Sequence, residues 1–146
     1  MKISTKGRYA IRLMIDIAQH SQGENVSIKD ISQRQNISLK YLEQIVNMLG
    51  RAGFLRSQRG AQGGYRLTRK PNEYTIGDIL RVTEGDMAPV SCLEDETNMC
   101  PRVNQCPTID FWTGFYKTIN DYLDSTTIED LLHKAEENND DFCYYI

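Results

Sequence analysis

Three cysteines lie close together in the second half of the chain. Cys92, Cys100 and Cys106 occur in the stretch VSCLEDETNMCPRVNQCPT with the spacing Cys-x7-Cys-x5-Cys. Structural zinc sites usually place paired cysteines about two to four residues apart. Thiolates spread along a loop are instead suited to wrapping an iron–sulfur cluster. The spacing therefore favours such a cluster, and unliganded thiols that act as redox switches stay open as the alternative.

Composition indicates the compartment in which these thiols occur. The chain has 146 residues, of which 40% are hydrophobic and 25% are charged, as is typical of globular proteins. It contains no run of eighteen apolar residues, and its first residues, MKISTKGR, do not resemble a secretory signal. We therefore expect a cytoplasmic protein without a membrane partner. Thiols are kept reduced there, which favours metal binding or redox sensing over structural disulfides.

Charge is divided unevenly along the chain. Residues 1–70 contain 13 Lys and Arg against 4 Asp and Glu, a net charge of +9. Residues 71–146 contain 4 Lys and Arg against 16 Asp and Glu, a net charge of −12. Such asymmetry predicts a first half that binds nucleic acid and a second half with another task.

The basic half is predicted to begin with three helices. Residues 9–18 are apolar on nearly all sides and predict a buried helix. Ser27 and Ser38 can each cap a following helix, and Asn36-Ile37 forms the short connection between them. The third helix has an apolar stripe at Leu42, Ile45, Val46 and Leu49, and its other face carries Lys40, Tyr41, Glu43, Gln44 and Asn47. This arrangement favours a helix-turn-helix with a polar recognition face.

A basic hairpin follows the third helix. Residues 54–57 and 65–68 read as two short strands, and the glycines between them supply the turn. Arg56, Arg59, Arg66, Arg69 and Lys70 lie in or beside this hairpin. A basic hairpin in this place is typical of a wing, whose arginines contact phosphates or the minor groove.

The first ninety residues also carry a family resemblance. The segments MKISTKGRYAIRLMIDIA, ISLKYLEQIVNMLGRAGFLRSQRGAQGGYRLTR and TIGDILRVTEG closely resemble the winged-helix regulators of the IscR, CymR and NsrR type. The elements YLEQ and RGAQGGY are specific to that type. The resemblance implies a homodimeric transcription factor that binds double-stranded DNA. By position, it assigns DNA contacts to Ser38, Lys40, Tyr41, Glu43 and Gln44 of the recognition helix and to Arg56 and Arg59 of the wing.

Glu43 has two interpretations within this scheme. A carboxylate near DNA repels phosphates, so Glu43 either accepts a hydrogen bond from a cytosine amino group or penalises unwanted sequences. The alternative is that Glu43 only pairs locally with Lys40 or Asn47.

The acidic half is predicted to contain three more helices. Thr75 and Asp78 form a capping pair, Pro107 opens a long helix, and Thr127 caps a last short one. The long helix carries a broad aromatic face, which could pack across the first helix, although its width and the family resemblance favour dimerisation. We expect a mainly α protein: a winged helix-turn-helix domain at 1–72, a cluster loop with dimerisation helices at 73–135, and a flexible acidic tail at 136–146.

The resemblance sharpens the assignment of the cysteines. In the IscR branch, three cysteines at this place bind a 2Fe–2S cluster, so Cys92, Cys100 and Cys106 are the implied ligands here. The fourth ligand is open. The histidine of IscR-like proteins is replaced by Ile109, and the acidic ligand of NsrR-like relatives by Arg8. Asp110, Cys143 or an exogenous thiol are the remaining candidates.

The last residues, DDFCYYI, indicate a rival function. They resemble the end of CymR, a relative that lacks the three cysteines and regulates cysteine metabolism together with cysteine synthase. A C-terminal isoleucine, Ile146, could enter the active site of such an enzyme.

Together these observations predict a DNA-binding repressor rather than an enzyme. It senses iron–sulfur or redox status through a 2Fe–2S cluster, or, in the rival interpretation, it is a cluster-free regulator of cysteine metabolism. A thiol-based electron carrier is disfavoured because the chain lacks a Cys-x-x-Cys pair and a cofactor-binding motif. The operator sequence does not follow from these patterns, and repression rather than activation is an expectation that they do not fix.

Overall fold

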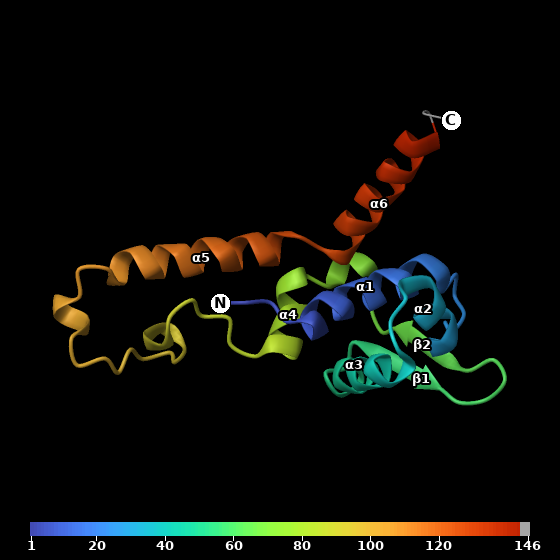
Figure 1. The fold of residues 1–146 in the computed structure, drawn as a ribbon, viewed down its shortest axis with the longest axis horizontal. Coiled ribbons are helices and arrows are strands. Elements are labelled where there is room, and N and C mark those ends of the chain that lie inside the picture. Colours follow the sequence, from blue (N-terminus) through green and yellow to red (C-terminus); the bar gives the residue numbers. More distant parts are fainter. Residues whose placement is uncertain (144–146) are drawn as a thin grey trace.

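The computed structural model describes residues 1–143 and, within them, six α-helices and one two-stranded sheet (Figure 1). The basic half forms a compact body, and the acidic half adds two long helices that leave it (Figure 1). The elements are α1 (Thr5–His20), α2 (Ile28–Gln35), α3 (Leu39–Arg51), β1 (Leu55–Gln58), β2 (Gly64–Leu67), α4 (Ile76–Glu84), α5 (Ile109–Ser125) and α6 (Ile128–Cys143).

The helix starts follow from side-chain caps. Ser4, Ser27 and Ser38 each accept a hydrogen bond from the backbone N–H three residues further on. Thr75 and Asp78 form a complete capping box at the start of α4. The mainly α prediction and the caps predicted at Ser27, Ser38 and Thr75 are thus confirmed. The cap at Ser4 was not predicted, and α1 begins at Thr5 rather than at residue 9.

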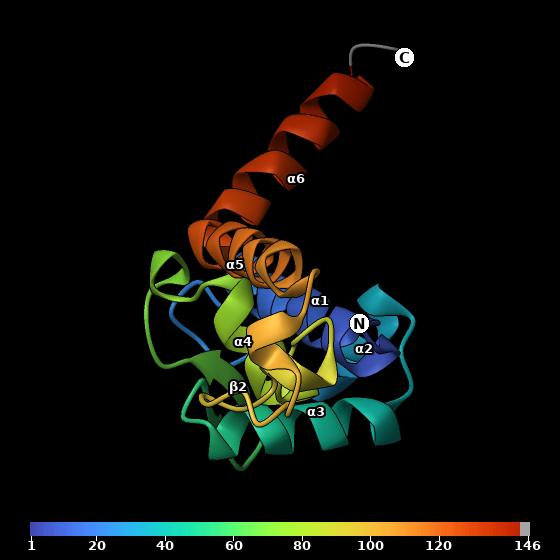
Figure 2. The ribbon, with the colours of Figure 1, turned by 90° about the vertical axis from the view of Figure 1, so that its left-hand side faces the viewer.

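The core lies where α1 crosses α3 and α4. Leu13, Met14 and Ile17 of α1 are fully buried, together with the predicted apolar stripe of α3. Ile128, the first residue of α6, is also fully buried and joins this core. The start of α6 therefore packs on the compact body of the basic half, whereas the rest of the helix projects away from it (Figure 2).

The joint between α5 and α6 is hydrogen-bonded to the segment that precedes α4. The Ile128 N–H donates to the carbonyl of Tyr74 at 3.0 Å, and the Ile76 N–H donates to the carbonyl of Thr126 at 2.8 Å. Arg81 of α4 also forms an ion pair with Asp124 of α5 at 2.7 Å. These contacts fix the direction in which α5 leaves the body.

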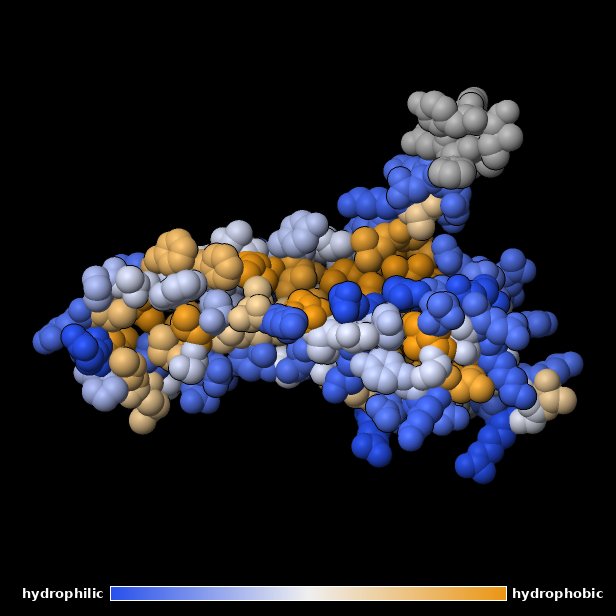
Figure 3. Space-filling view, in the orientation of Figure 1, coloured by the Kyte–Doolittle hydropathy of each residue, from blue (hydrophilic) through white to orange (hydrophobic). Residues whose placement is uncertain are grey.

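Helix α5 buries none of its own residues in the single chain. Phe111, Phe115 and Tyr122 are exposed by 63%, 40% and 67%. Apolar side chains gather along α5 and continue onto the base of α6 (Figure 3). An apolar surface of this extent is typical of an interface with a second chain, as the aromatic pattern predicts.

Two details of the acidic half also differ from the sequence-based expectation. Helix α5 begins at Ile109 rather than at Pro107, so the proline lies just outside the first turn. Helix α6 runs to Cys143, so the acidic stretch expected to be a flexible tail is helical as far as that residue. Glutamate is a good helix former, and the stretch continues a helix already anchored by Ile128. Among residues 1–143, no helix is both long and apolar enough to cross a membrane.

Candidate functional site

Helices α2 and α3 form the helix-turn-helix. Asn36 ends α2 in the left-handed conformation, with φ of 54°, which asparagine tolerates better than most residues. Ile37 follows and is buried, and Ser38 starts α3. The predicted connection at Asn36-Ile37 is therefore confirmed.

The turn is held from behind by a buried ion pair. Asp16 of α1 is fully buried and accepts hydrogen bonds from both Nε and a terminal nitrogen of Arg34, the latter at 2.7 Å. Gln35 donates to the same carboxylate at 2.8 Å. These contacts hold the end of α2 against α1, and the hydrogen bond to Asp16 raises the pKa of Arg34 above its ordinary value.

The outer face of α3 presents polar side chains to solvent. Lys40, Glu43 and Gln44 are exposed, and none of them forms an ion pair within the described part of the chain. Ser38 is exposed and caps the helix through its hydroxyl. Tyr41 differs from the others because its ring is half-buried and packs edge-on against Tyr9, with ring centroids 5.6 Å apart. Its assignment to DNA binding stays a prediction, as do the other assignments.

The predicted wing is the antiparallel hairpin of β1 and β2. Leu55 pairs with Leu67 and Arg56 with Arg66, one residue away from the limits expected for each strand. Val26 exchanges two backbone hydrogen bonds of 2.8 Å with Tyr65, which ties the hairpin to the segment before α2. Gly64 permits this approach, because its φ is +144° and an added Cβ would lie 2.3 Å from the Val26 carbonyl oxygen. Arg56 and Arg59 are exposed on the strand and at the tip.

Tyr74 holds the base of the wing. Its side chain is fully buried, and its hydroxyl accepts from the backbone N–H groups of Thr68 and Arg69 at 3.0 and 2.9 Å. The same hydroxyl donates to the carbonyl of Phe54 at 2.9 Å. One side chain therefore joins the entry and exit of the hairpin. The sequence reasoning missed this residue, because a lone tyrosine before a helix has no distinctive pattern.

The three candidate cluster ligands lie in the loop between α4 and α5. Cys92 and Cys100 line a common hollow of about 290 Å³, and Cys106 lies outside it. All three thiols are free and partly exposed. Within residues 1–143 no three histidine, cysteine or acidic side chains are gathered as a metal site. The structure thus brings two of the three predicted ligands together and leaves the third apart.

The candidates for a fourth ligand lie on different elements. Asp110 is exposed in the first turn of α5. Arg8, which replaces the acidic ligand of NsrR-like relatives and is not itself a candidate, is exposed on α1 and donates a hydrogen bond to Thr5 at 3.1 Å. Cys143 ends α6, and its side chain lies outside the described residues, as does Ile146. The fourth ligand therefore remains an open prediction.

Family comparison decides the class of the protein. The family model for Rrf2, described as an iron-dependent transcriptional regulator, matches residues 3–134. The chain belongs to the Rrf2 family. The HTH-type transcriptional regulator CymR of Bacillus subtilis is 42% identical over 147 residues, which cover 100% of both chains.

Solved structures agree with this assignment. The structure of CymR, the global cysteine regulator of B. subtilis, matches with a TM-score of 0.76 at 42% identity, covering 92% of this chain and 98% of that one. The structure of T. potens IscR matches with a TM-score of 0.72 at 40% identity, covering 94% and 90%. The winged-helix prediction is therefore confirmed, and the protein is an Rrf2 transcriptional regulator.

Glu43 is expected to set sequence discrimination in this Rrf2 regulator. It makes no side-chain hydrogen bond or ion pair to Lys40 or Asn47 within the described residues, which weakens the local-pairing interpretation. Replacing Glu43 by alanine should reduce the ratio of specific to non-specific DNA affinity by about 10- to 100-fold, roughly the effect of one base pair. Selection from a randomised duplex pool measures that ratio.

Lys40 supplies the matched control for this experiment. Replacing it by alanine should weaken binding to all DNA sequences equally, because Lys40 would contact only phosphate. The slope of the logarithm of the binding constant against the logarithm of the salt concentration should also fall in magnitude by about one. An unchanged sequence preference in Glu43→Ala would assign Glu43 a role outside recognition.

Cys106 is expected to be alkylated at lower pH than an ordinary thiol. The hydroxyl of Thr108, 3.5 Å from the sulfur, and the Thr108 backbone N–H lower the pKa of Cys106 by stabilising its thiolate. In metal-free Rrf2 protein, the rate of iodoacetamide modification at Cys106 should therefore rise at lower pH than in the Thr108→Val variant. Mass spectrometry between about pH 5 and pH 9 follows the reaction.

Thr118→Val is the control, because Thr118 bonds only to the Gly114 carbonyl of its own helix. Identical pH profiles for the wild type and Thr108→Val would contradict the assigned cause.

Proposed function

We propose that this Rrf2 regulator binds operator DNA as a homodimer and represses transcription in response to iron–sulfur status. In this proposal α3 and the wing contact the duplex, and the aromatic face of α5 forms the dimer interface. The observation that carries the sensing part is the placement of three accessible thiols in the loop that leads directly into α5. A change in that loop would act on the dimer helix.

The donor set fits a 2Fe–2S cluster in its chemistry. Cys92, Cys100 and Cys106 would hold it, since thiolates are the usual ligands of such clusters and all three are free. Two of them already share a hollow, and the stabilised thiolate of Cys106 is suited to completing the set. A bound cluster supplies a group that is sensitive to iron supply and to oxidants.

The loop has a direct connection to α5. Asp86, which follows the end of α4, accepts a hydrogen bond from the hydroxyl of Tyr116 on α5 at 3.4 Å. Met87 is buried beside it in the core. The beginning of the loop is thus held to both the body and the dimer helix, so closure of the loop around a cluster would bias how α5 packs.

Iron and acid-labile sulfide in protein purified without oxygen test this proposal. We expect about two irons and two sulfides per chain, with visible absorption that the Cys92→Ala, Cys100→Ala and Cys106→Ala variants lose. DNA binding of the same samples, with and without the cluster, should differ. A colourless protein after reconstitution that binds DNA with the same affinity as the reconstituted alanine variants would refute the sensing proposal and leave DNA binding intact.

A second candidate function is control of cysteine metabolism without a cluster. The observation that favours it is the 42% identity to B. subtilis CymR along the whole length of both chains. In this alternative the C-terminal Tyr-Tyr-Ile binds cysteine synthase. Pull-down of a bacterial cysteine synthase by the full chain and by a chain lacking Ile146 tests it, and equal recovery would end the idea.

A further inference from the structure

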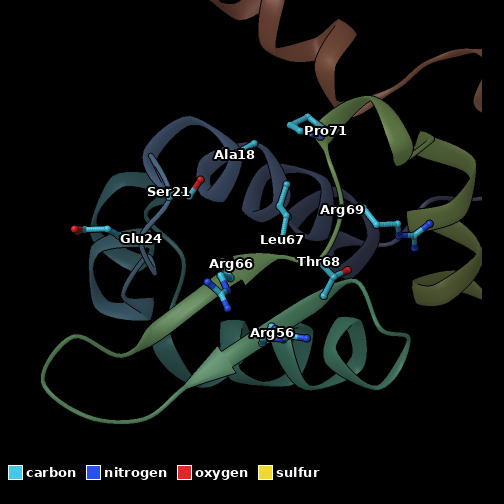
Figure 4. A pocket seen from close by; sticks show the side chains of 10 residues that line it. Ala18, Ser21, Glu24, Arg56, Arg66, Leu67, Thr68, Arg69 and Pro71 are labelled. Atoms are coloured by element: carbon cyan, nitrogen blue, oxygen red, sulfur yellow. The ribbon is translucent and has the colours of Figure 1, made fainter.

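A hollow of about 430 Å³ separates the wing from the C-terminal end of α1 (Figure 4). Ala18 and Pro71 form an apolar wall, and the hydroxyl residues Ser21 and Thr68 interrupt it. The volume falls in the range of sites for small molecules. The arginines of the hollow belong to the wing, which the function proposed above places on the duplex, but a small ligand in the hollow plays no part in that function.

Two arginines stand together on the wing side of the hollow. Arg56 of β1 and Arg66 of β2 are directly opposite each other in the hairpin register. Neither has an acidic partner within 4.0 Å among the residues that the structure describes. Like charges directly opposite each other destabilise a strand pair, so the hairpin carries an unfavourable charge pair that an anion would relieve.

The neighbouring charged groups do not neutralise this pair. Glu24 lines the hollow, and its carboxyl group is directed away from the two arginines (Figure 4). Arg69 also lines the hollow, but its guanidinium stacks over the rings of Phe54 and Tyr74, 5.1 and 4.8 Å from their centroids. Arg56 and Arg66 are therefore the two available cations of the hollow.

The hollow faces away from the recognition helix. Ser57 and Tyr65, the cross-strand pair next to Arg56 and Arg66, line a different hollow with Asn47 and Arg51 of α3. Because side chains alternate between the two faces of a strand, Arg56 and Arg66 belong to the other face of the hairpin. A ligand bound there would touch the wing and α1 without covering the exposed face of α3.

We propose that Arg56 and Arg66 bind the oxyanion of a small phosphate ester in this hollow. Paired guanidinium groups match the geometry of a phosphate through charge-assisted hydrogen bonds. The apolar wall would contact the organic part of the ligand, and the Ser21 hydroxyl offers a further hydrogen bond, whereas the Thr68 hydroxyl already donates to the Gly53 carbonyl. The ligand would bridge the wing and the end of α1. It would thus act on the DNA-binding unit at a site separate from the cysteine loop.

Calorimetric titration with inorganic phosphate and with phenyl phosphate tests the site in the full-length protein. Chloride keeps the ionic strength constant, so that general screening does not contribute. We expect both probes to bind, phenyl phosphate more tightly because of the apolar wall. Arg66→Gln and Arg56→Gln should each weaken phosphate binding by at least about tenfold. Arg51→Gln, at the end of α3 beside the other face of the hairpin, should weaken it by less than about twofold.

Thermal unfolding without phosphate excludes a folding defect as the cause. Arg66→Gln removes the like-charge pair, so its midpoint at low salt should equal or exceed that of the wild type. Equal phosphate binding by the wild type and both glutamine variants would overturn the site.

Measuring the DNA affinity of the same variants shows whether Arg56 and Arg66 bind the phosphate of a small molecule or the phosphates of the duplex. No phosphate binding, combined with DNA affinity that falls in both variants, would assign the arginines to the duplex backbone and overturn the proposal.

Discussion

Replacing Arg34 by methionine is expected to lower the free energy of unfolding by about 3 kcal/mol. The substitution keeps most of the side-chain volume and removes the cation that pairs with Asp16, whose side chain is fully buried. Gln35 still donates to the carboxylate, but one neutral hydrogen bond does not replace a guanidinium that binds both oxygens. Urea denaturation at neutral pH measures the loss.

Two variants make this result decisive. Arg51→Met removes an exposed arginine from α3 and should change stability by less than about 0.5 kcal/mol. Asp16→Leu combined with Arg34→Leu removes both charges, and it should be more stable than Arg34→Met because no unpaired buried charge remains. If Arg34→Met lost less than about 1 kcal/mol, the ion pair would not be what holds α2 against α1.

Replacing Tyr74 by phenylalanine is expected to cost about 3 kcal/mol and to weaken DNA binding. The ring stays in place, but the backbone N–H groups of Thr68 and Arg69 lose their acceptor, and the carbonyl of Phe54 loses a donor. Since these groups are the entry and exit of the hairpin, the wing should become mobile relative to α3. Thermal unfolding and DNA titration on the same samples measure both effects.

Tyr9→Phe is the matched control, because it removes the hydroxyl of a half-buried tyrosine on α1 that makes no hydrogen bond to another described residue. Its stability should be unchanged within about 0.5 kcal/mol. Comparable losses in Tyr74→Phe and Tyr9→Phe would contradict the role assigned to Tyr74.

Much of the DNA-binding body follows from local sequence patterns. Serine caps, the period of the apolar stripe of α3 and the glycine-rich turn each act over a few residues, so the sequence predicts their elements to within one or two positions. The exposed set of Lys40, Glu43 and Gln44 follows from the same period, because the buried stripe determines which side of α3 is left outside.

The contacts that fix these elements in space do not follow from local patterns. Asp16 appears in the sequence as a charge on an apolar helix, and only the approach of Arg34, eighteen residues later, makes its burial favourable. Tyr74 likewise acts on Phe54, twenty residues earlier. Such pairings depend on the tertiary fold and have no period that a sequence could display.

The cysteine loop could be predicted from the sequence only in part. The sequence locates the three thiols in one loop, and the structure confirms that location. The separation of Cys106 from the hollow shared by Cys92 and Cys100 was not predictable, because it depends on how a loop without regular structure folds.

Tyr74 has a further role, because two parts of the molecule are attached to it at different atoms. Its hydroxyl holds the wing, and its backbone carbonyl accepts the N–H group of Ile128, the first residue of α6. One path from α5 and α6 to the wing therefore runs through Tyr74 and does not pass through α3. In a dimer joined through α5, the stiffness of this joint would determine how freely each wing turns while the recognition helices keep their distance.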